Sequence, residues 1–538
     1  MRTGWKRLAA GVATLAMGLA LAAAAPKPAE PARGPAAVAP PVTPEGDMVV
    51  SHGQVAVDGR PLRYTVHAGL LPIYDNDTGQ LAARIFIIAY TADRAPGAAP
   101  RPLTFLWNGG PGSSSSQIHL MGFGPKGFSM PATYPEWKAP PAKLADRPET
   151  WLTASDLVFV DPVGTGYSRA TSEAWRERLY TQHGDAEAVA EAIRVYRTRF
   201  DAFDAPLFIG GESYGTTRAM EVAGALARRR TPLSGVILIS GSYEVGEKVP
   251  AATRQALEVT LYTATAWYHH RLPADLQALP QDQAVARAAA WARSDYAPAL
   301  AHPDQLSPEQ RAAIVAALAR YSGVDSKVVD ARTLRLGKDA VMDNMLADKG
   351  LELGRYDARL AIPHRAPGQV WGPREDPSLL PMIDLMEGTS PALIRYLRGD
   401  LGYHSDLLYR GPWGGSFHPD PYLPTGPVLK DDWMAAMWDH HAALNGGRGA
   451  GAAAGPPEPP PLAAAMTAEP KLLVWSVEGL YDGSCAERAE AIADSPAPLR
   501  ARVRASCYPA GHMVYTDRAV RLSLQRDFTA FVHDATAR

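Results

Sequence analysis

The stretch from residue 206 to residue 215 constrains the fold of this chain more than any other region of the sequence. It reads Pro-Leu-Phe-Ile-Gly-Gly-Glu-Ser-Tyr-Gly, and a helix-forming run begins near Thr216. Its apolar residues predict a short buried strand, and its glycines predict a sharp turn. The turn contains Gly211-x-Ser213-x-Gly215, in which small residues on both sides of the serine let strand and helix crowd together. The sequence therefore predicts an elbow that lifts the Ser213 hydroxyl above a sheet edge.

Apolar strands alternate with helices on either side of this elbow. Strands that are apolar on both faces and alternate with helices indicate a mostly parallel sheet covered on both sides. Two earlier segments predict antiparallel strands, with turns at Asp58-Gly59 and Asn76-Asp77. The predicted fold class is α/β, with helices that flank a mostly parallel central sheet. Strands are expected at 48–66, 81–91, 103–107, 157–160, 236–239, 472–475 and 503–508, and helices at 185–200 and 518–533.

The amino terminus predicts export. Basic residues at positions 2, 6 and 7 precede an apolar, alanine-rich run that ends in small residues, which indicates a signal peptide over 1–25. An uncleaved membrane anchor is the alternative, because the run is near the lower length for a membrane span. After cleavage we expect an exported protein, periplasmic or extracellular, with no stable membrane association.

The rest of the chain divides where its composition and rhythm change. Residues 26–46 are rich in Pro and Ala and predict an extended linker. The capped helix start Ser307-Pro308-Glu309-Gln310 lies in a region where helices dominate, which we interpret as an inserted cap. The expected divisions are a first core segment at 47–246, the cap at 247–424, and a second core segment at 425–538, with a return helix at 431–444 and a flexible loop at 446–461.

The composition narrows the class of function. The formal net charge is -2, so nothing indicates a nucleic-acid partner. The 14 histidines include no H-E-x-x-H pattern, so we expect no metal. The glycines at 122–127 spell G-x-G-x-x-G without a preceding strand, so we expect no dinucleotide cofactor. The two cysteines, Cys485 and Cys507, either form a disulfide, which export allows, or remain separate thiols.

Catalysis by Ser213 requires partners elsewhere in the chain. A serine hydroxyl is a poor nucleophile without a base and a third group that orients the base. In this architecture the acid and the histidine follow the serine, each after the carboxyl end of a strand. His512 follows one expected strand, and Asp482 and Glu478 follow another. The sequence therefore predicts Ser213 as nucleophile, His512 as base, and either Asp482 or Glu478 as the orienting acid.

An oxyanion hole needs two backbone N–H groups beside the nucleophile. One is expected from Tyr214, the residue after the serine. The other is expected from the glycine-rich loop 108–112, which follows an early strand. We predict Gly110 as this donor, because glycine permits the close backbone approach that a tetrahedral oxygen demands.

Four motifs stand out along the chain: Trp107-Asn108-Gly109-Gly110-Pro111-Gly112-Ser113-Ser114-Ser115, Asp161-Pro162-Val163-Gly164-Thr165-Gly166-Tyr167-Ser168, Gly211-Glu212-Ser213-Tyr214-Gly215 and Gly511-His512-Met513. Together they resemble motifs of the serine carboxypeptidases. The resemblance covers roughly residues 85–245 and 470–520. It implies an α/β-hydrolase fold, removal of C-terminal residues from peptides, and the roles given above for the nucleophile, the base and both oxyanion donors. It favours Asp482 over Glu478, because Asp482-Gly-Ser-Cys485 matches the family's Asp-x-x-Cys, whose cysteine is usually a free thiol.

The resemblance also implies how a peptide would be held. Asn108 and Glu212 match residues that hold the terminal carboxylate of the substrate. Two facing carboxyl groups need a shared proton, which favours acidic pH. The sequence departs from the family at Gly122, where relatives carry a second glutamate. This departure affects recognition of the terminal carboxylate and not the acyl-transfer chemistry.

Two other functions compete with that of a serine carboxypeptidase. An esterase or acyltransferase could use the same acyl-enzyme, because one fold supports several acceptors. An exported binding protein with an inactive hydrolase fold is the third interpretation. The presence of Ser213, Asp482 and His512 argues against it.

Overall fold

The computed structural model describes residues 48–128, 144–246, 249–365, 376, 378, 391–411 and 459–537 of the 538-residue chain. The expected signal peptide (1–25), linker (26–46) and return helix (431–444), and most of the expected loop at 446–461, lie outside these residues. Within the described ranges, no helix has both the length and the apolar character needed to cross a membrane.

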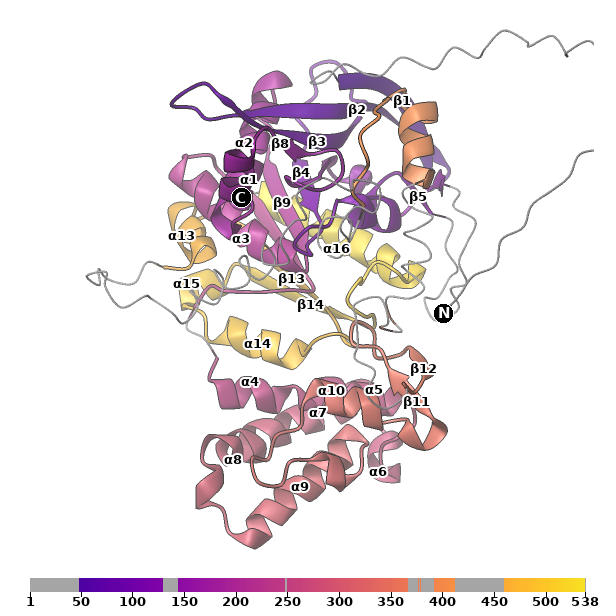
Figure 1. Cartoon of the computed structure of the whole chain (residues 1–538), viewed down its shortest axis with the longest axis vertical. Helices are drawn as coiled ribbons and strands as arrows, with labels where there is room; N and C mark the ends of the chain where they lie inside the picture. Colours follow the sequence, from indigo (N-terminus) through magenta and orange to yellow (C-terminus); the bar gives the residue numbers. More distant parts are fainter. Residues whose placement is uncertain are drawn as a thin grey trace, which may run out of the picture. The chain divides into compact units, whose positions relative to one another are not determined.

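One sheet organises the described residues (Figure 1). Its strands are β1 (Met48–Val57), β2 (Arg60–Tyr74), β3 (Leu81–Ala92), β4 (Leu103–Trp107), β7 (Asp156–Val160), β8 (Arg169–Ala170), β9 (Leu207–Glu212), β10 (Gly235–Ile239), β13 (Leu473–Gly479) and β14 (Val503–Tyr508). Their order is β1-β2-β3-β7-β4-β9-β10-β13-β14, and β8 pairs with β3. The six strands from β7 to β14 in this order are parallel, whereas the pairs of β1, β2, β3 and β8 are antiparallel.

The strand order confirms the predicted α/β-hydrolase fold. Strand β7 lies between β3 and β4 although it follows β4 in the chain, and β9, β10, β13 and β14 then join the β4 edge in turn. The first hairpin also forms as predicted. Asp58 and Gly59 both have positive φ, at 48° and 75°, which is the backbone conformation of a tight two-residue hairpin turn.

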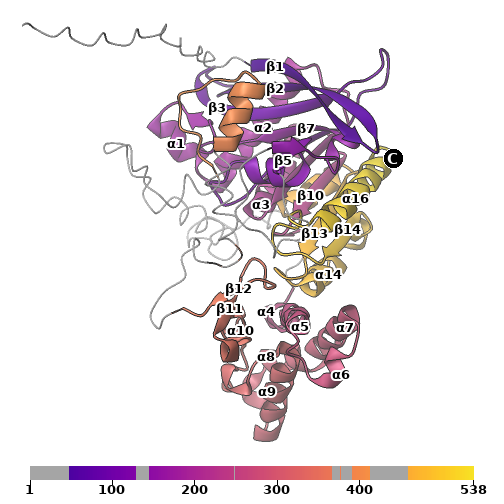
Figure 2. The same ribbon diagram turned by 90° about the vertical axis from the view of Figure 1, so that its right-hand side faces the viewer.

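Helices cover both faces of the sheet. On one face, α2 (Gln182–Arg199), α3 (Tyr214–Arg228) and α13 (Pro461–Ala468) share a buried apolar cluster with the strands. On the other face lie α16 (Arg518–Thr536; Figure 2) and the short helix η1 (Ile118–Phe123). Neighbouring residues of one strand enter opposite clusters, which is why the parallel strands are continuous apolar runs in the sequence.

A mainly helical segment lies between β10 and β13, and we call its described residues 249–365 the insertion. It has its own buried apolar cluster, which Tyr481 from the segment after β13 also enters. The predicted capping box is confirmed, because Ser307 and Gln310 exchange hydrogen bonds of 3.2 and 2.8 Å. Its elements are α4 (Ala251–Leu257), α5 (Val259–Tyr268), α6 (Ala274–Gln277), α7 (Gln281–Trp291), α8 (Ala297–Ala301), α9 (Pro308–Ser322), α10 (Lys338–Asn344), β11 (Leu351–Leu353) and β12 (Ala361–Pro363).

Short elements complete the described chain. Their bounds, with those of the remaining α-helices, are β5 (Lys126–Phe128), β6 (Leu144–Asp146), α1 (Glu173–Leu179), α14 (Cys485–Ala493) and α15 (Ala497–Arg500). Strands β5 and β6 pair with each other, and α14 follows β13.

Candidate active site

The predicted strand–turn–helix elbow is present between β9 and α3. Ser213 has φ 59° and ψ -130°, a conformation that costs a non-glycine residue about 1–3 kcal/mol and persists only where the surroundings impose it. Its backbone N–H donates to the Ile239 carbonyl at 2.9 Å. A Cβ at Gly211 would lie 1.9 Å from the Gly215 carbonyl oxygen. Glycine at both positions therefore allows the tight crossing that exposes the serine.

The loop 108–112 lies directly against this elbow. A Cβ at Gly109 would lie 2.5 Å from the backbone nitrogen of Tyr214. Gly110 has φ 101°, which favours glycine, and it precedes a cis peptide bond to Pro111. Tyr214 is the first residue of α3, so its N–H points out of the amino end of the helix. The structure thus places Gly109, the neighbour of the predicted donor Gly110, against the backbone nitrogen of the predicted donor Tyr214.

A buried arginine joins the loop to the elbow helix. Arg218 is 2% exposed, and its guanidinium donates to Asp185 at 2.6 Å and to the backbone carbonyl of Asn108 at 2.7 Å. The indole of Trp107 also donates to the Gly215 carbonyl, at 2.9 Å. The sequence pattern does not single out Arg218, because the same helix run also carries the charges of Glu221 and Arg228.

The predicted base and acid meet at the carboxyl ends of β13 and β14. The Nδ1 atom of His512 lies 2.7 Å from Oδ2 of Asp482, and the two side chains are 13% and 14% exposed. Among the described residues, Ser213 and His512 share no hydrogen bond. Catalytic hydrogen bonds are often long in a free enzyme and shorten when substrate binds.

The second candidate acid, Glu478, is turned to another partner. It lies 2.5 Å from Arg488, and it is 6% exposed. Burial raises its pKa to about 7, against the attraction of Arg488. Of the two acids that the residues alone left open, Asp482 contacts His512 and Glu478 does not.

The surroundings of the His512 imidazole act on its pKa in opposite directions. Burial acts to lower the pKa of His512, but Asp482 and Glu212 outweigh it and raise this pKa to about 9. Burial raises the pKa of Glu212 above its ordinary value. A proton on Glu212 therefore removes one of the two negative charges that hold a proton on His512. The two groups titrate as a coupled pair.

Asn108, Glu212 and Tyr515 form a buried hydrogen-bonded cluster beside Ser213. The three residues are 0%, 2% and 0% exposed. The Asn108 amide donates to the Glu212 carboxyl, and the Tyr515 hydroxyl is hydrogen-bonded to Glu212 and lies 3.5 Å from the Asn108 amide. A Cβ at Gly122 would lie 3.4 Å from the Tyr515 ring. The ring thus occupies the space in front of Gly122, a placement that the sequence did not signal.

The two cysteines are joined. Cys485 and Cys507 form a disulfide with their Cα atoms 6.0 Å apart. Strands β13 and β14 are neighbours, and Cys507 pairs with Glu478 in their register. Of the two alternatives left by the sequence, the disulfide is found, and the free thiol usual at the matching family position is not. The disulfide lies three residues after Asp482 and ties the start of α14 to the edge strand.

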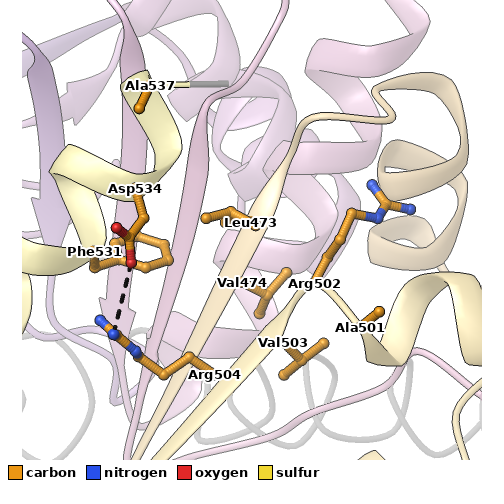
Figure 3. Close-up of a pocket in the computed structure, with 9 residues that line it drawn as sticks. All are labelled: Leu473, Val474, Ala501, Arg502, Val503, Arg504, Phe531, Asp534 and Ala537. Atoms are coloured by element: carbon orange, nitrogen blue, oxygen red, sulfur yellow. Dashed lines mark ion pairs between the residues drawn. The ribbon is translucent and has the colours of Figure 1, made fainter.

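A separate cavity lies at the other end of these strands. It has a volume of about 290 Å³ and is lined by residues that include Leu473, Val474, Val503 and Arg504 (Figure 3). These residues begin β13 and β14, whereas the predicted acid and base follow the carboxyl ends of the same strands. The cavity is therefore distinct from the candidate active site.

Sequence comparison relates this architecture to a known family. The family model for serine carboxypeptidases matches residues 59–283, which confirms the predicted resemblance over this stretch of the chain. The pheromone-processing carboxypeptidase KEX1 of Komagataella phaffii is 32% identical over 163 residues, covering 28% of this chain and 22% of the relative. Serine carboxypeptidase-like 51 of Arabidopsis thaliana is 31% identical over 150 residues, covering 26% of this chain and 29% of the relative. The chain thus matches less than a third of either relative's length.

A solved structure is also similar. The prohormone-processing carboxypeptidase KEX1(DELTA)P from Saccharomyces cerevisiae aligns with a TM-score of 0.48 at 15% identity. The alignment covers 88% of this chain and 92% of that chain.

Proposed function

Because residues 59–283 match the serine carboxypeptidase family, we propose that this protein is a serine peptidase that releases C-terminal residues from peptides. The observation that carries the proposal is the 2.7 Å contact between His512 and Asp482, on loops beside the strained elbow of Ser213. A nucleophile, a base and an orienting acid in this order are the components of acyl transfer through a covalent intermediate.

The proposed reaction begins with attack by Ser213 Oγ on the scissile carbonyl while Nε2 of His512 accepts the hydroxyl proton. The Nδ1–H of His512 donates to Asp482, which fixes the tautomer and stabilises the imidazolium. Backbone N–H groups of Gly110 and Tyr214 stabilise the oxyanion. His512 then protonates the leaving amine, and the released C-terminal residue departs. Water, deprotonated by His512, hydrolyses the acyl-enzyme and restores Ser213.

Asn108 and Glu212 are proposed to hold the terminal carboxylate of the peptide. Glu212 directly precedes the nucleophile, and burial favours its protonated form by raising its pKa. A protonated carboxyl group can donate a hydrogen bond to a carboxylate, whereas an ionised one repels it. Peptide binding should therefore weaken as pH rises through the pKa of Glu212.

An esterase on the same machinery is the second candidate, and Tyr515 favours it. The hydroxyl of Tyr515 already gives Glu212 a hydrogen-bonding partner inside the protein. A carboxyl group that has an internal partner depends less on a substrate carboxylate for its hydrogen bonds. Substrates with blocked C-termini should accordingly be accepted more readily than a site with two free acids would allow.

We propose that the protein acts outside the cytoplasm, in the periplasm or beyond the cell. The disulfide between Cys485 and Cys507 fits an oxidising compartment. Peptides are the proposed substrates, and the amino-terminal apolar run is the proposed export signal.

Digestion of a peptide library, analysed by mass spectrometry, tests the proposal. Wild-type protein should release single residues from C-termini, and Ser213→Ala should abolish this release and the labelling by a fluorophosphonate. The control variant Ser326→Ala alters an exposed serine of the insertion and should retain both properties. Labelling without peptide cleavage, together with hydrolysis of the matching methyl esters, would favour the esterase.

A further inference from the structure

A lysine from the insertion contacts the predicted catalytic acid. Lys338, the first residue of α10, donates from Nζ to the backbone carbonyl of Asp482 at 2.7 Å. The same nitrogen lies 3.8 Å from the Asp482 carboxylate, and the lysine side chain is 33% exposed. The contact joins residues 144 positions apart in the chain. It places a cation from the insertion beside the acid–base pair.

The insertion also contacts the loop that carries His512. The backbone N–H of His512 donates to the Tyr356 carbonyl at 2.6 Å, and the two rings meet edge to face with centroids 5.2 Å apart. Ala358 donates to the carbonyl of Tyr481, next to Asp482, at 3.0 Å. The insertion therefore fixes the positions of both loops from the side opposite the sheet.

The charge balance at the imidazole depends on this lysine. Asp482 and Glu212 favour a proton on His512, and Lys338 supplies the opposing cation. Its charge disfavours the imidazolium and favours the ionised form of Asp482. Lys338 also attracts Glu258, which is hydrogen-bonded to Tyr262 within the insertion. The charged and titratable groups facing His512 are Asp482, Glu212, Glu478, Lys338 and the ring of Tyr356.

We propose that Lys338 is a positioning residue of the acid–base pair, which fixes the Asp482 loop and keeps His512 neutral at lower pH than the neighbouring carboxylates alone would allow. The inference rests on the proposed function, because it assigns Lys338 a role in the same base catalysis. It gives the insertion a role in the chemistry of the proposed reaction. A base that stays neutral at lower pH is useful where peptide binding requires a protonated Glu212.

A charge series at position 338 tests the inference. The variants are Lys338→Arg, Lys338→Met and Lys338→Glu, and the measurement is kcat/KM for an ester substrate as a function of pH. An ester lacks the terminal carboxylate. The decrease of its kcat/KM toward low pH, which we call the acidic fall, therefore reports the protonation of His512 alone. Lys338→Met should move this fall to higher pH by roughly half a unit to one unit, and Lys338→Glu should move it further. Lys338→Arg, which keeps the charge, should leave it in place.

A matched control and a second measurement separate the possible failures. Lys327→Met removes an exposed charge elsewhere in the insertion and should leave the profile unchanged. The pH dependence of fluorophosphonate labelling should shift in the same way, because it requires the same base and no peptide.

Two results would overturn the inference. In one, Lys338→Met lowers activity with its acidic fall unmoved, which is the result of a purely structural contact. In the other, the three variants shift the fall equally, without regard to charge. Failure of the proposed function looks different, because wild-type protein would then not be labelled by the fluorophosphonate, or Ser213→Ala would still be labelled and active.

Discussion

The proposed nucleophile and the proposed acid–base pair are held in place in different ways. Ser213 lies on an elbow that is fixed by glycines and by backbone contacts within the sheet core. Asp482 and His512 lie on loops that touch the insertion on their outer side, through Lys338 and Tyr356. Local sequence therefore specifies the position of the proposed nucleophile, whereas contacts between distant segments of the chain specify the positions of the proposed acid and base.

Removing the proposed catalytic groups should have the largest effect on activity. This effect should be similar for the nucleophile and for the acid–base pair. Ser213→Ala and His512→Ala should each lower kcat by about 10⁴-fold or more, because the residues act as a unit. Asp482→Asn should cost nearly as much, and Glu478→Gln little, because Glu478 faces Arg488 and not His512. Steady-state kinetics on one peptide checks this order. A larger loss for Glu478→Gln than for Asp482→Asn would transfer the acid's role to Glu478.

Among the contacts that hold the elbow of Ser213, those of Arg218 should contribute most to the stability of the fold. Arg218→Met leaves Asp185 buried without its partner, so it should destabilise the fold by about 3–5 kcal/mol. The measurement is the midpoint of denaturant unfolding followed by tryptophan fluorescence. Arg178→Met, an exposed arginine of α1, serves as the control and should change the midpoint little. Equal midpoints for the two variants would show that the contacts of Arg218 do not stabilise the fold.

Removing the disulfide should have a smaller effect on stability, confined to the region of Asp482 and His512. Replacing both cysteines by serine should cost about 2–4 kcal/mol, because the closed loop of the unfolded chain is then released. Since Cys485 follows Asp482 closely, activity should decline with temperature before the sheet unfolds. Calorimetry and activity assays on the same samples check this order. If activity and the folded sheet are lost at the same temperature in the variant, as in wild type, the disulfide stabilises the whole sheet and not the loop of Asp482 alone.

The smallest effects concern the coupled charges. Burial raises the pKa of Glu212, so peptide binding is favoured at low pH and is lost as pH rises through that pKa. Glu212→Gln should flatten the alkaline fall of kcat/KM for peptides. It also removes a negative charge from His512, so the acidic fall for esters should move to lower pH, opposite to Lys338→Met. Profiles that do not differ between peptide and ester would remove Glu212 from carboxylate recognition.

Tyr515 offers a control for that pair of profiles. Tyr515→Phe keeps the ring against Gly122 and removes only the hydroxyl that is hydrogen-bonded to Glu212. Because that hydrogen bond lowers the pKa of Glu212, its loss should move the alkaline fall for peptides to higher pH, with a small change for esters. An equal loss of activity on both substrates would indicate that Tyr515 only fills space.

The sequence predicted what short-range patterns encode. The elbow, the first hairpin and the capping box at Ser307 each depend on a few neighbouring residues, and each is present. The mostly parallel sheet followed from the alternation of apolar strands and helices. The roles of the seven predicted site residues stay predictions, although the structure gathers those residues in one place.

What the sequence did not signal are contacts between distant segments. Lys338 and Tyr515 look like ordinary residues of a helix start and a loop, and nothing in their neighbours indicates an acid or a base. The disulfide was undecided because the distance between two strand ends depends on which strands are neighbours. Such distances are set by the packing of the whole domain rather than by local periodicity.

The placement of Tyr481 has a consequence for how such a protein can be changed. This residue directly precedes Asp482, yet its ring is buried in the apolar cluster of the insertion, where Gln281 donates to its hydroxyl at 2.8 Å. The insertion is thus no interchangeable module. Replacing the insertion by another cap would remove the apolar cluster that holds Tyr481. The support of the loop that carries Asp482 would be lost with it. A change in the insertion should therefore also change turnover.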